Sequence, residues 1–424
     1  MLQVSFIREN KEKVVKGLEK RYFQNAQVVI DKVIELDDSR KLAKSRQDDV
    51  LAESNSLSRK IGSLMKEGKR DEAEEIKKKT SDLKSEGKRL GEELGQTQDE
   101  LQSLLYTIPN VPNDKVPGGK TPEDNEIVYE HGETPDLPHN ALPHWDLIKK
   151  YDIIDFELGV KVTGAGFPIY KGKGARLQRA MINFFLDEAI KAGYYEVQPP
   201  IVINQDSGYG TGQLPDKDGQ MYYAGADDLY LIPTAEVPIT NMYRDTILSD
   251  EQLPVKHVGY TPCFRREAGA WGANVRGLNR LHQFDKVEVV QIQQPEHSYD
   301  VLKEMCEYVQ GLLEKLGLQY RVLNLCAGDL GFTSAQTFDM EVYSAAQEKW
   351  LEVSSVSNFE TYQANRLKLR CKGPDKKTHL LHTLNGSALA LPRILASIIE
   401  NNQTDNGISI PEVLVPYAGF DMIS

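Results

Sequence analysis

Two stretches between residues 28 and 105 carry apolar or small residues at every seventh position. The first series consists of Leu36, Ala43, Val50, Leu57 and Leu64, with Val33 and Ile61 at the neighbouring seam position. The second consists of Ala73, Thr80, Gly87, Leu94 and Leu101, accompanied by Ile76, Leu83, Leu90, Thr97 and Leu104. A period of 3.5 residues is typical of long paired helices. Because the polar break "KEGKRDEAE" separates the two series, the pattern predicts an antiparallel helical hairpin with arms roughly 50 Å long.

The hydrophobic periodicity stops between residues 108 and 143. This stretch contains "IPNVPNDKVPGGKTPEDNE", which is rich in proline, glycine and acidic residues and cannot sustain a helix. We therefore expect three parts. An N-terminal domain at 1–107 contains the helical arm at about 28–105, a linker follows at 108–143, and a second domain occupies 144–424.

The second domain alternates short strand patterns with few helices. Residues 174–194 have helical apolar spacing that ends at Gly193, and helices are also expected at 298–316 and 390–401. The expected strands are "DLYLIPTAE", "VKHVGYTPCFRRE", "HQFDKVEVVQI", "FDMEVYSA" and "KWLEVSSVSN". A further strand, "YYEVQPPIVI", contains two prolines, which place it at a sheet edge or an interface. Strands in succession predict an α+β fold with a mainly antiparallel sheet.

The formal net charge of -12 argues against a general nucleic-acid coat, so that any RNA contact has to be regional. Residues 59–89 are the exception, with 11 Lys and Arg against 7 Asp and Glu. This local excess fits a solvated helix face with ion pairs four residues apart. It also fits an arm that contacts phosphates, and charge alone leaves both readings open.

The N-terminal stretch "MLQVSFIREN" has no apolar signal core, and no apolar run is long enough to span a bilayer. We therefore expect a cytoplasmic protein without a membrane partner. The four cysteines are far apart, which predicts neither disulfides nor a zinc site. The chain also lacks the glycine-rich phosphate loop and the dinucleotide fingerprint.

The segment from Thr261 to Val290 predicts a hairpin with chemistry on one face. If neither strand is bulged, Arg265 and Glu267 share a side, and Phe284, Lys286 and Glu288 share a side on the partner strand. A guanidinium can grip a phosphate, an aromatic ring can stack on a base, and a carboxylate can accept from an exocyclic amine. A surface hairpin with ion pairs fits this segment alone equally well.

Three other segments favour a nucleotide site. They contribute Thr234 and Glu236 in "PTAEVPIT"; Glu352, Ser354 and Ser355 in "LEVSSVSN"; and Asn385, Gly386 and Ser387 ahead of a helix with Arg393. The first pair suits an ammonium group. The second group offers the hard oxygen ligands that magnesium prefers when phosphates share it.

Together with "TGQLP" at 211–215 and "RGLNRLHQFDKVE", these motifs resemble the class II aminoacyl-tRNA synthetases, and within them the seryl-tRNA synthetases of bacterial type. The resemblance covers essentially the whole chain. It implies a class II antiparallel catalytic sheet flanked by helices, with an N-terminal coiled-coil hairpin. It also implies a homodimer that uses ATP and Mg²⁺ to form seryl-adenylate from L-serine and transfers serine to the 3′ end of tRNA(Ser), with tRNA(Sec) as an open second acceptor.

The resemblance also assigns site residues. The L-serine site would consist of Thr234, Ala235, Glu236, Glu288 and Ser387. The ATP site would consist of Arg265, Arg266, Glu267, Leu281, Phe284, Glu352, Val353, Ser354, Ser355 and Arg393. Among these, Arg265 and Arg393 would be the catalytic cations, and Glu352 and Ser355 would hold magnesium.

The chain departs from the family pattern at several positions. Arg266 stands where many relatives have serine, and the loop "GAWGANVRG" contains Trp271 in place of a more polar sequence. Asn365 replaces a more usual arginine, and Pro392 replaces a common glycine. We expect local adjustments at these positions, whereas the tRNA contacts of the loop stay open. Arg266, Arg276 and Arg280 are expected to serve that loop.

Two other functions compete with tRNA charging as interpretations of the sequence. A synthetase-like ligase that charges a carrier protein typically lacks the long arm and binds zinc through cysteine, and this chain has both heptad series and scattered cysteines. A catalytically silent coiled-coil protein has no need for Arg265, Glu267, Glu352 and Arg393. The sequence therefore favours a serine–tRNA ligase.

Overall fold

The computed structural model describes residues 1–216, 218–268 and 276–424. The chain forms two compact units. The larger consists of Met1, Lys20–Tyr22 and Asn110–Ser424, and the smaller of Leu2–Glu19 and Phe23–Pro109. Trp271 and most of the loop "GAWGANVRG" lie outside the described residues, so the expectation for that loop stays a prediction.

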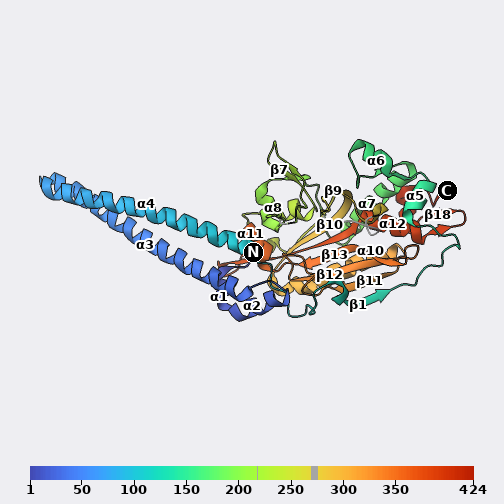
Figure 1. Ribbon diagram of the computed structural model, residues 1–424, viewed down its shortest axis with the longest axis horizontal. Coiled ribbons are helices and arrows are strands. Elements are labelled where there is room, and N and C mark those ends of the chain that lie inside the picture. Colours follow the sequence, from blue (N-terminus) through green and yellow to red (C-terminus); the bar gives the residue numbers. More distant parts are fainter. Residues whose placement is uncertain (217, 269–275) are drawn as a thin grey trace. The chain divides into compact units, whose positions relative to one another are not determined.

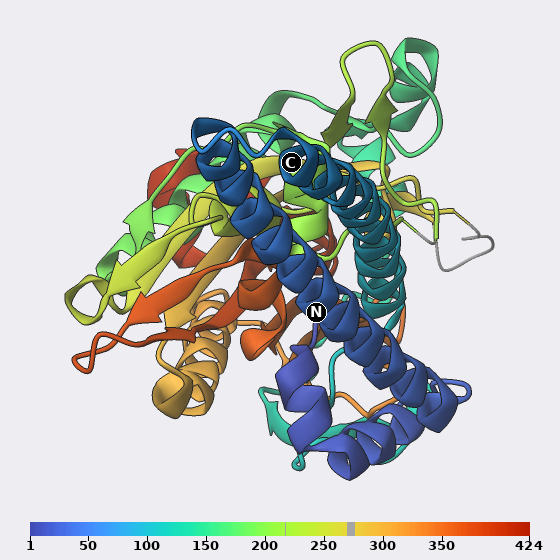
Figure 2. The same cartoon turned by 90° about the vertical axis from the view of Figure 1, so that its left-hand side faces the viewer.

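The smaller unit is helical. Its helices are α1 (Val4–Glu9), α2 (Lys11–Lys20), α3 (Ala26–Lys66) and α4 (Arg70–Thr107). Helices α3 and α4 lie side by side in both ribbon views (Figures 1 and 2). The seam residues that are buried between them include Leu36, Ala43, Ala73, Leu94 and Leu101. The long helical hairpin predicted from the heptads is therefore confirmed.

Two glycines of α4 face α3. A Cβ on Gly91 would lie 2.8 Å from Gln47 Nε2, at the end of a flexible side chain, and one on Gly87 would lie 3.5 Å from Leu51 Cδ2, which is an ordinary contact. Glycine in a helix interior costs about 1 kcal/mol relative to alanine. The packing against α3 therefore does not require glycine at either position.

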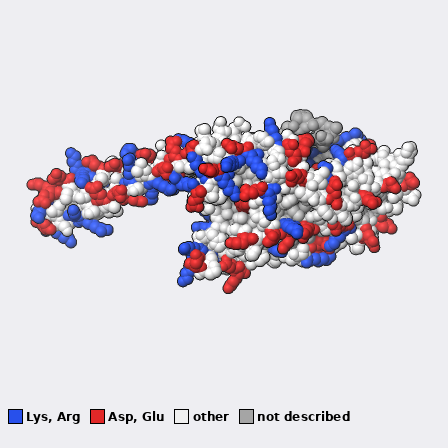
Figure 3. All heavy atoms as spheres, turned by 90° about the horizontal axis from the view of Figure 1, so that it is seen from below, with Lys and Arg blue, Asp and Glu red and all other residues white. Residues whose placement is uncertain are grey.

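Charged side chains of both signs are interspersed on the visible face of α3 and α4 (Figure 3). Several basic residues of 59–89 are paired, for example Lys79 with Glu53 at 2.8 Å. Within the described part of the chain, other exposed basic residues of this region form no ion pair, namely Arg59, Lys60, Lys66, Arg70, Lys78 and Lys84. The arm therefore has ion pairs and also unpaired cations.

An eight-stranded sheet forms the centre of the larger unit. In sheet order its strands are β1 (Glu126–His131), β11 (Tyr320–Asn324), β12 (Gln336–Ser344), β13 (Lys349–Asn358), β16 (His382–Ala390), β10 (Gln283–Gln293), β9 (Val255–Phe264) and β4 (Tyr195–Glu196). All neighbours are antiparallel except β4 and β9, which are parallel. The predicted α+β fold with a mainly antiparallel sheet is confirmed.

Three amphipathic helices cover one face of this sheet: α7 (Gly172–Lys191), α10 (Ser298–Lys315) and α12 (Leu391–Asn401) (Figure 1). Val287 and Val289 of β10 are fully buried in the core that these helices share with the sheet. Because side chains alternate along a strand, Lys286 and Glu288 point to the other face. That face is where the candidate site lies.

Smaller elements surround the sheet. The helices are η1 (Pro122–Asp124), α5 (His144–Lys150), α6 (Phe156–Val162), α8 (Gln205–Thr211), α9 (Glu236–Asn241), η2 (Asp250–Gln252), η4 (Gly277–Asn279), η5 (Pro295–His297), α11 (Thr361–Leu367), η6 (Glu412–Leu414) and α13 (Val415–Ala418). The strands are β2 (Ile154–Asp155), β3 (Ile169–Tyr170), β5 (Val202–Ile203), β6 (Tyr223–Ala224), β7 (Leu229–Leu231), β8 (Ile247–Ser249), β14 (Arg370–Lys372), β15 (Thr378–Leu380), β17 (Gln403–Thr404), β18 (Gly407–Ser409) and β19 (Met422–Ile423). Across the described residues, no helix combines the length and apolar character needed to cross a membrane.

The structure corrects several element boundaries. Strand β9 ends at Phe264, so Arg265 and Glu267 follow the strand instead of lying within it. Glu236 opens helix α9, whereas the sequence was interpreted as ending a strand there. Strand β1 forms inside the stretch predicted as a linker. All of its residues are exposed, so the sequence has no alternation of buried and exposed positions that would indicate a strand. The position of β4 at a sheet edge agrees with its two following prolines.

Candidate active site

A cavity of about 580 Å³ opens on the sheet face opposite the three covering helices. Its walls come from β10, β13, β16, η4, the segment after β9 and the start of α12. The lining residues that sequence reasoning had named are Thr234, Glu236, Arg265, Glu267, Leu281, Phe284, Glu288, Glu352, Val353, Ser354, Ser355, Ser387 and Arg393. The fold thus brings together segments that are up to about 160 residues apart in the chain, from Thr234 to Arg393.

Two of the candidate residues do not line this cavity within the described chain. Ala235 is fully buried as the residue that precedes α9, so that only its backbone is available to a ligand nearby. The Arg266 guanidinium lies 5.7 Å from the centre of the Tyr222 ring, and its backbone N–H donates to Gln220. The assignment of Arg266 to ATP stays a prediction that this geometry does not support.

Arg265 and Phe284 form a cation–π pair in the lining of the cavity. The guanidinium carbon of Arg265 lies 5.3 Å from the centre of the Phe284 ring, and Nε donates to the Pro233 carbonyl at 3.4 Å. The backbone N–H of Arg265 donates to His282 at 2.9 Å, which holds the chain beside β10 after the strand has ended. The cation and the ring are therefore placed to contact a phosphate and an aromatic base side by side.

Glu267 is held by an ion pair with Arg280, and its backbone has a φ of 50°. A positive φ is uncommon for a residue with a side chain, and it turns the carboxylate toward the cavity wall. Arg280 lines the same cavity, although the sequence had assigned it to the loop. Arg276 lies 4.7 Å from the Trp145 ring of α5, at the described end of that loop.

The deep end of the cavity combines two glutamates and a lysine. Lys286 Nζ lies 2.7 Å from Glu288 Oε2, and both side chains are buried. Ser387 donates to the same Glu288 oxygen at 3.3 Å. Gln363 of α11 donates to Glu236 Oε1 at 2.6 Å. This end is small, polar and closed, which suits a compact amino acid with a hydroxyl group.

Glu236 has an unusual ionisation equilibrium. Burial and the neighbouring Glu288 carboxylate raise the pKa of Glu236 to about 7, although Gln363 and Lys286 act in the opposite direction. The carboxylate is therefore half protonated near neutral pH. Only the ionised form can make an ion pair with an ammonium group.

This pKa predicts a pH dependence. The apparent KM for serine is expected to fall as the pH rises from 6 to 7 and to level off above about 7.5, with about a tenfold change per pH unit well below the pKa. The reason is that binding at low pH must first ionise Glu236. Pyrophosphate exchange measured as a function of serine concentration at each pH tests this. A flat KM across this range would contradict a role of Glu236 in binding the ammonium group.

A second prediction uses Lys286. Because its charge lowers the pKa of Glu236, Lys286→Met should move the pH at which the serine KM levels off upward. Removing one partner of a buried ion pair also destabilises by about 3–5 kcal/mol. The KM profile and the melting temperature are therefore measured on the same preparation. An unchanged profile in a folded variant would show that Lys286 does not control this carboxylate.

A bulge in β13 aligns two residues that regular alternation would separate. Glu352 faces Glu341 and Ser354 faces Met340, which leaves Val353 without a partner on β12. Glu352 and Ser355 are three apart, an odd spacing that places side chains on opposite faces of a regular strand. Because the bulge inserts one residue, both side chains line the cavity.

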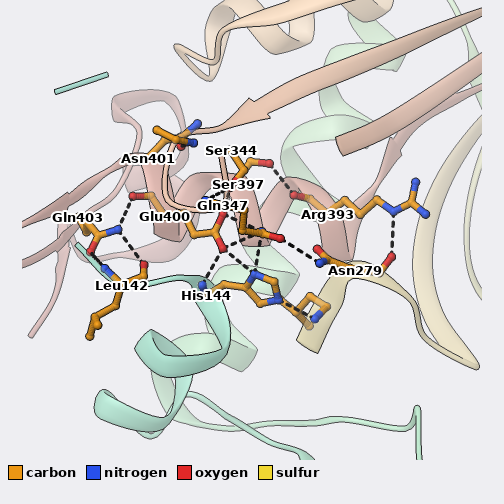
Figure 4. A network of polar contacts seen from close by, with 12 residues as sticks. Leu142, His144, Asn279, Ser344, Gln347, Arg393, Ser397, Glu400, Asn401 and Gln403 are labelled. Carbon is orange, nitrogen blue, oxygen red and sulfur yellow. Dashed lines mark hydrogen bonds and ion pairs between the residues drawn. The ribbon is translucent and has the colours of Figure 1, made fainter. Parts of the chain in front are cut away.

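Arg393 approaches β13 from the start of α12. Its Nη1 donates to the Glu352 carbonyl at 2.7 Å and lies 3.6 Å from Glu352 Oε2. Its Nε donates to the Asn279 carbonyl at 3.0 Å, as Figure 4 shows. Pro392, which departs from the family pattern, occupies the first turn of α12. A backbone N–H in the first turn has no acceptor within the helix, so a proline costs no hydrogen bond there.

The residues around Glu352 fit a hard divalent cation. Within the described residues, Asp339 Oδ1 is buried and has no hydrogen-bond partner. Burial and the charge of Glu352 raise the pKa of Asp339. The described chain contains no group of three or more His, Cys, Asp or Glu residues that could hold a metal alone. Magnesium takes few protein ligands, so Glu352 and Ser355 would leave most of its coordination to phosphates and water.

Sequence reasoning missed several residues of the cavity. Lys286 was placed on the correct face but received no role, and Asn385 was noted without one; it lies beside Glu236, whose pKa it lowers. Asn279 lies within the motif "RGLNRLHQFDKVE" but received no role. Gln363, which donates to Glu236 from outside the cavity lining, was not named. Asn365 donates to the Met1 carbonyl at 2.9 Å, away from the cavity lining.

The antiparallel sheet and the site on its open face define a class II aminoacyl-tRNA synthetase core. A model of the tRNA synthetase class II core domain (G, H, P, S and T) matches residues 222–402, and the seryl-tRNA synthetase N-terminal domain matches residues 1–112. The chain belongs to the seryl-tRNA synthetase family.

Individual relatives agree with this assignment over their full lengths. The serine–tRNA ligase of Salinibacter ruber is 48% identical over 425 residues, which cover 100% of this chain and 99% of the relative. That of Thermodesulfovibrio yellowstonii is 44% identical, with 100% of each chain covered. The crystal structure of seryl-tRNA synthetase from Pyrococcus horikoshii complexed with ATP has a TM-score of 0.92 at 32% identity, covering 100% of this chain and 99% of that one.

Proposed function

We propose that this serine–tRNA ligase activates L-serine with ATP and transfers the seryl group to the 3′ end of tRNA(Ser). The observation that carries the proposal is one cavity with a cationic, aromatic end at Arg265 and Phe284 and a closed polar end at Glu236 and Glu288. A relative solved with ATP supports the nucleotide as substrate. Cytoplasmic location, a homodimer and tRNA(Sec) as a second acceptor remain part of the proposal.

In the first step a serine carboxylate oxygen attacks the α-phosphorus, and the bond from that phosphorus to pyrophosphate breaks. Charge develops on the phosphoryl oxygens, so the reaction needs positioned positive charge more than a general base. Arg265 and Arg393 approach the cavity from opposite walls and would supply that charge. A magnesium ion bound by Glu352 and Ser355 would neutralise further phosphate charge.

Serine selection follows from the closed polar end. Glu236 and Thr234 would accept from the ammonium group, and Glu288 with Ser387 would bind the hydroxyl group. An amino acid without the hydroxyl group would leave buried polar atoms unpaired, and such sites discriminate strongly. In the second step a terminal ribose hydroxyl of the tRNA attacks the seryl carbonyl, loses its proton and displaces AMP.

The homodimer is supported by exposed apolar side chains on the edge strand β4 and on α7, which contacts it. Tyr195 of β4 is 70% exposed, and Ile190 near the end of α7 is 47% exposed. Large exposed apolar side chains that lie together mark interaction surfaces. Sedimentation equilibrium of the full chain gives the oligomeric state.

The test of the function is ATP–pyrophosphate exchange with each amino acid in turn. Serine alone is expected to support exchange. If a different amino acid supports exchange, that amino acid and not serine is the substrate. If no amino acid supports exchange, the proposed activation is refuted. Charging of total tRNA with labelled serine, followed by identification of the acceptors, then separates tRNA(Ser) from tRNA(Sec).

A further inference from the structure

A buried carboxylate lies at the centre of a polar network beside the cavity (Figure 4). Glu400, near the C-terminal end of α12, has a fully buried side chain. Its Oε1 accepts from the backbone N–H of His144 at 2.7 Å, from His144 Nδ1 at 2.7 Å and from Gln347 Nε2 at 2.8 Å. Its Oε2 accepts from Gln347 at 3.0 Å and from the Ser344 hydroxyl. Both oxygens are therefore surrounded by donors.

The second ring nitrogen of His144 defines the tautomer. The backbone N–H of Leu278 in η4 donates to His144 Nε2 at 2.8 Å, so that Nε2 must carry a lone pair. The proton is therefore on Nδ1, which donates to Glu400, and the imidazole is neutral. Burial favours the protonated form of Glu400, but its donors outweigh this and hold the pKa below its usual value.

This arrangement is a costly way to stabilise a fold. Across the described residues, no lysine or arginine contacts the Glu400 carboxylate, and a negative charge near a helix C-terminus is unfavourable. Apolar packing at such a site is often neutral or stabilising by comparison. The hydrogen bonds of the network instead fix the orientations of the side chains and backbone groups that take part in it.

The network leads directly to Arg393. Leu278, held by His144, precedes Asn279, and the Asn279 carbonyl accepts from Arg393 Nε at 3.0 Å. The Asn279 amide also donates to Gln347 Oε1 at 3.0 Å. Thus η4 is attached to the carboxylate by two routes, one through the ring of His144 and one through Gln347.

Gly277 shows how closely η4 approaches the ring. It has a φ of 64°, and a Cβ at this position would lie 2.2 Å from His144 Nε2. Only glycine allows both this backbone conformation and this contact. Because Gln347 follows β12 and precedes β13, the same network also holds the hairpin whose second strand carries Glu352.

We propose that His144 and Glu400 are positioning residues for the nucleotide: they fix η4 so that the Asn279 carbonyl orients the Arg393 guanidinium over the cavity. The inference rests on the proposed ATP-dependent activation. Neither residue touches the cavity, and each acts through Leu278, Asn279 and Gln347.

The primary test is the dissociation constant of ATP, measured by calorimetry on the full chain with magnesium. His144→Asn keeps a donor for Glu400 but leaves the Leu278 N–H without an acceptor. We expect the Kd for ATP to rise about tenfold, which corresponds to the loss of about one hydrogen bond between the guanidinium and a phosphate. His144→Gln can return an acceptor to Leu278 and is expected to recover most of the affinity.

Gln347→Ala is the second variant, because Gln347 is only half-buried and the substitution breaks the other route while it keeps the hydrogen bonds of His144 to Glu400 and Leu278, although it removes a 3.3 Å contact between Gln347 Nε2 and His144 Nδ1. It is also expected to raise the Kd for ATP. Ser397→Ala is the matched control. Ser397 lies on the same helix, is buried, and donates to the Arg393 carbonyl within the helix at 2.8 Å. Its loss should lower the melting temperature slightly and leave the Kd for ATP unchanged.

A double variant separates positioning from simple packing. In an Arg393→Ala background, His144→Asn should raise the Kd for ATP no further, because the network then has no guanidinium to orient. Full additivity, or a wild-type Kd in both His144→Asn and Gln347→Ala, would overturn the inference. Binding of ATP is measured without serine, so a failure of serine activation in the wild type would refute the proposed function and leave this test intact.

Discussion

Arg265→Ala is expected to lower serine-dependent pyrophosphate exchange by about 1000-fold, the upper range for removing one preorganised electrostatic group. The other cations of that wall cannot replace it. Arg280 is paired with Glu267, and Lys286 is paired with Glu288. The measurement is exchange at saturating ATP and serine, together with the melting temperature to show that the variant is folded.

Two further substitutions test whether the effect depends on the guanidinium group and on its position in the cavity. Arg265→Lys keeps the charge but loses the planar fork that binds a phosphate through two donors, so its exchange rate should lie between those of wild type and Arg265→Ala. Arg244→Ala removes an arginine that donates to Ser207 at 3.1 Å and does not line the described cavity, and its exchange rate should match the wild type. Wild-type exchange in Arg265→Ala would remove Arg265 from the catalytic site.

Deleting residues 42–98 is expected to leave serine-dependent exchange intact and to abolish charging of tRNA. The contacts of the hairpin support these end points. Gly91 lies against Gln47, and Gly87 lies against Leu51. The helices are antiparallel, so a position four residues earlier in α4 lies against a position four residues later in α3. By this register, positions 42 and 98 are near neighbours, and a short glycine turn can join them.

The physical reason for the charging defect is the exposed set of unpaired basic residues between 59 and 89. Phosphate contacts of this kind supply much of the affinity for a nucleic acid and weaken steeply with salt. A full-length variant with Lys60, Lys66 and Lys78 changed to glutamate is the control for deletion artefacts, and it should raise the KM for tRNA without altering exchange. Normal charging by the shortened chain would refute the assignment of the arm to tRNA.

Much of the fold could be predicted because the helices and strands follow local patterns of apolar and polar residues. The heptads specified α3 and α4, and alternation with turn signals specified the strands of the antiparallel sheet. Strand β1 was missed since all of its residues are exposed, which removes the alternation on which a strand prediction depends. The end of β9 was placed too late because the polar sequence "RRE" is compatible with a strand and with a loop.

Some residues of the candidate site could be predicted from the sequence, and others could not. Residues in dense motifs, such as Arg265 and Glu352, line the cavity as expected, although their roles remain proposals. Gln363 could not be foreseen, because it reaches Glu236 from a helix 127 residues away in sequence. The network around Glu400 is equally invisible in the sequence, since its partners come from four separate segments. Such residues become apparent only when tertiary distances are known.

The bulge at Val353 has a consequence for how the core and the site are coupled. The Val353 side chain is almost fully buried in the apolar core, although the residue also borders the cavity that Glu352 and Ser355 line. A change in core volume at this position would rotate the local backbone and displace Glu352 and Ser355 together. In this strand, the volume of a single core side chain therefore affects the position of two polar groups in the cavity.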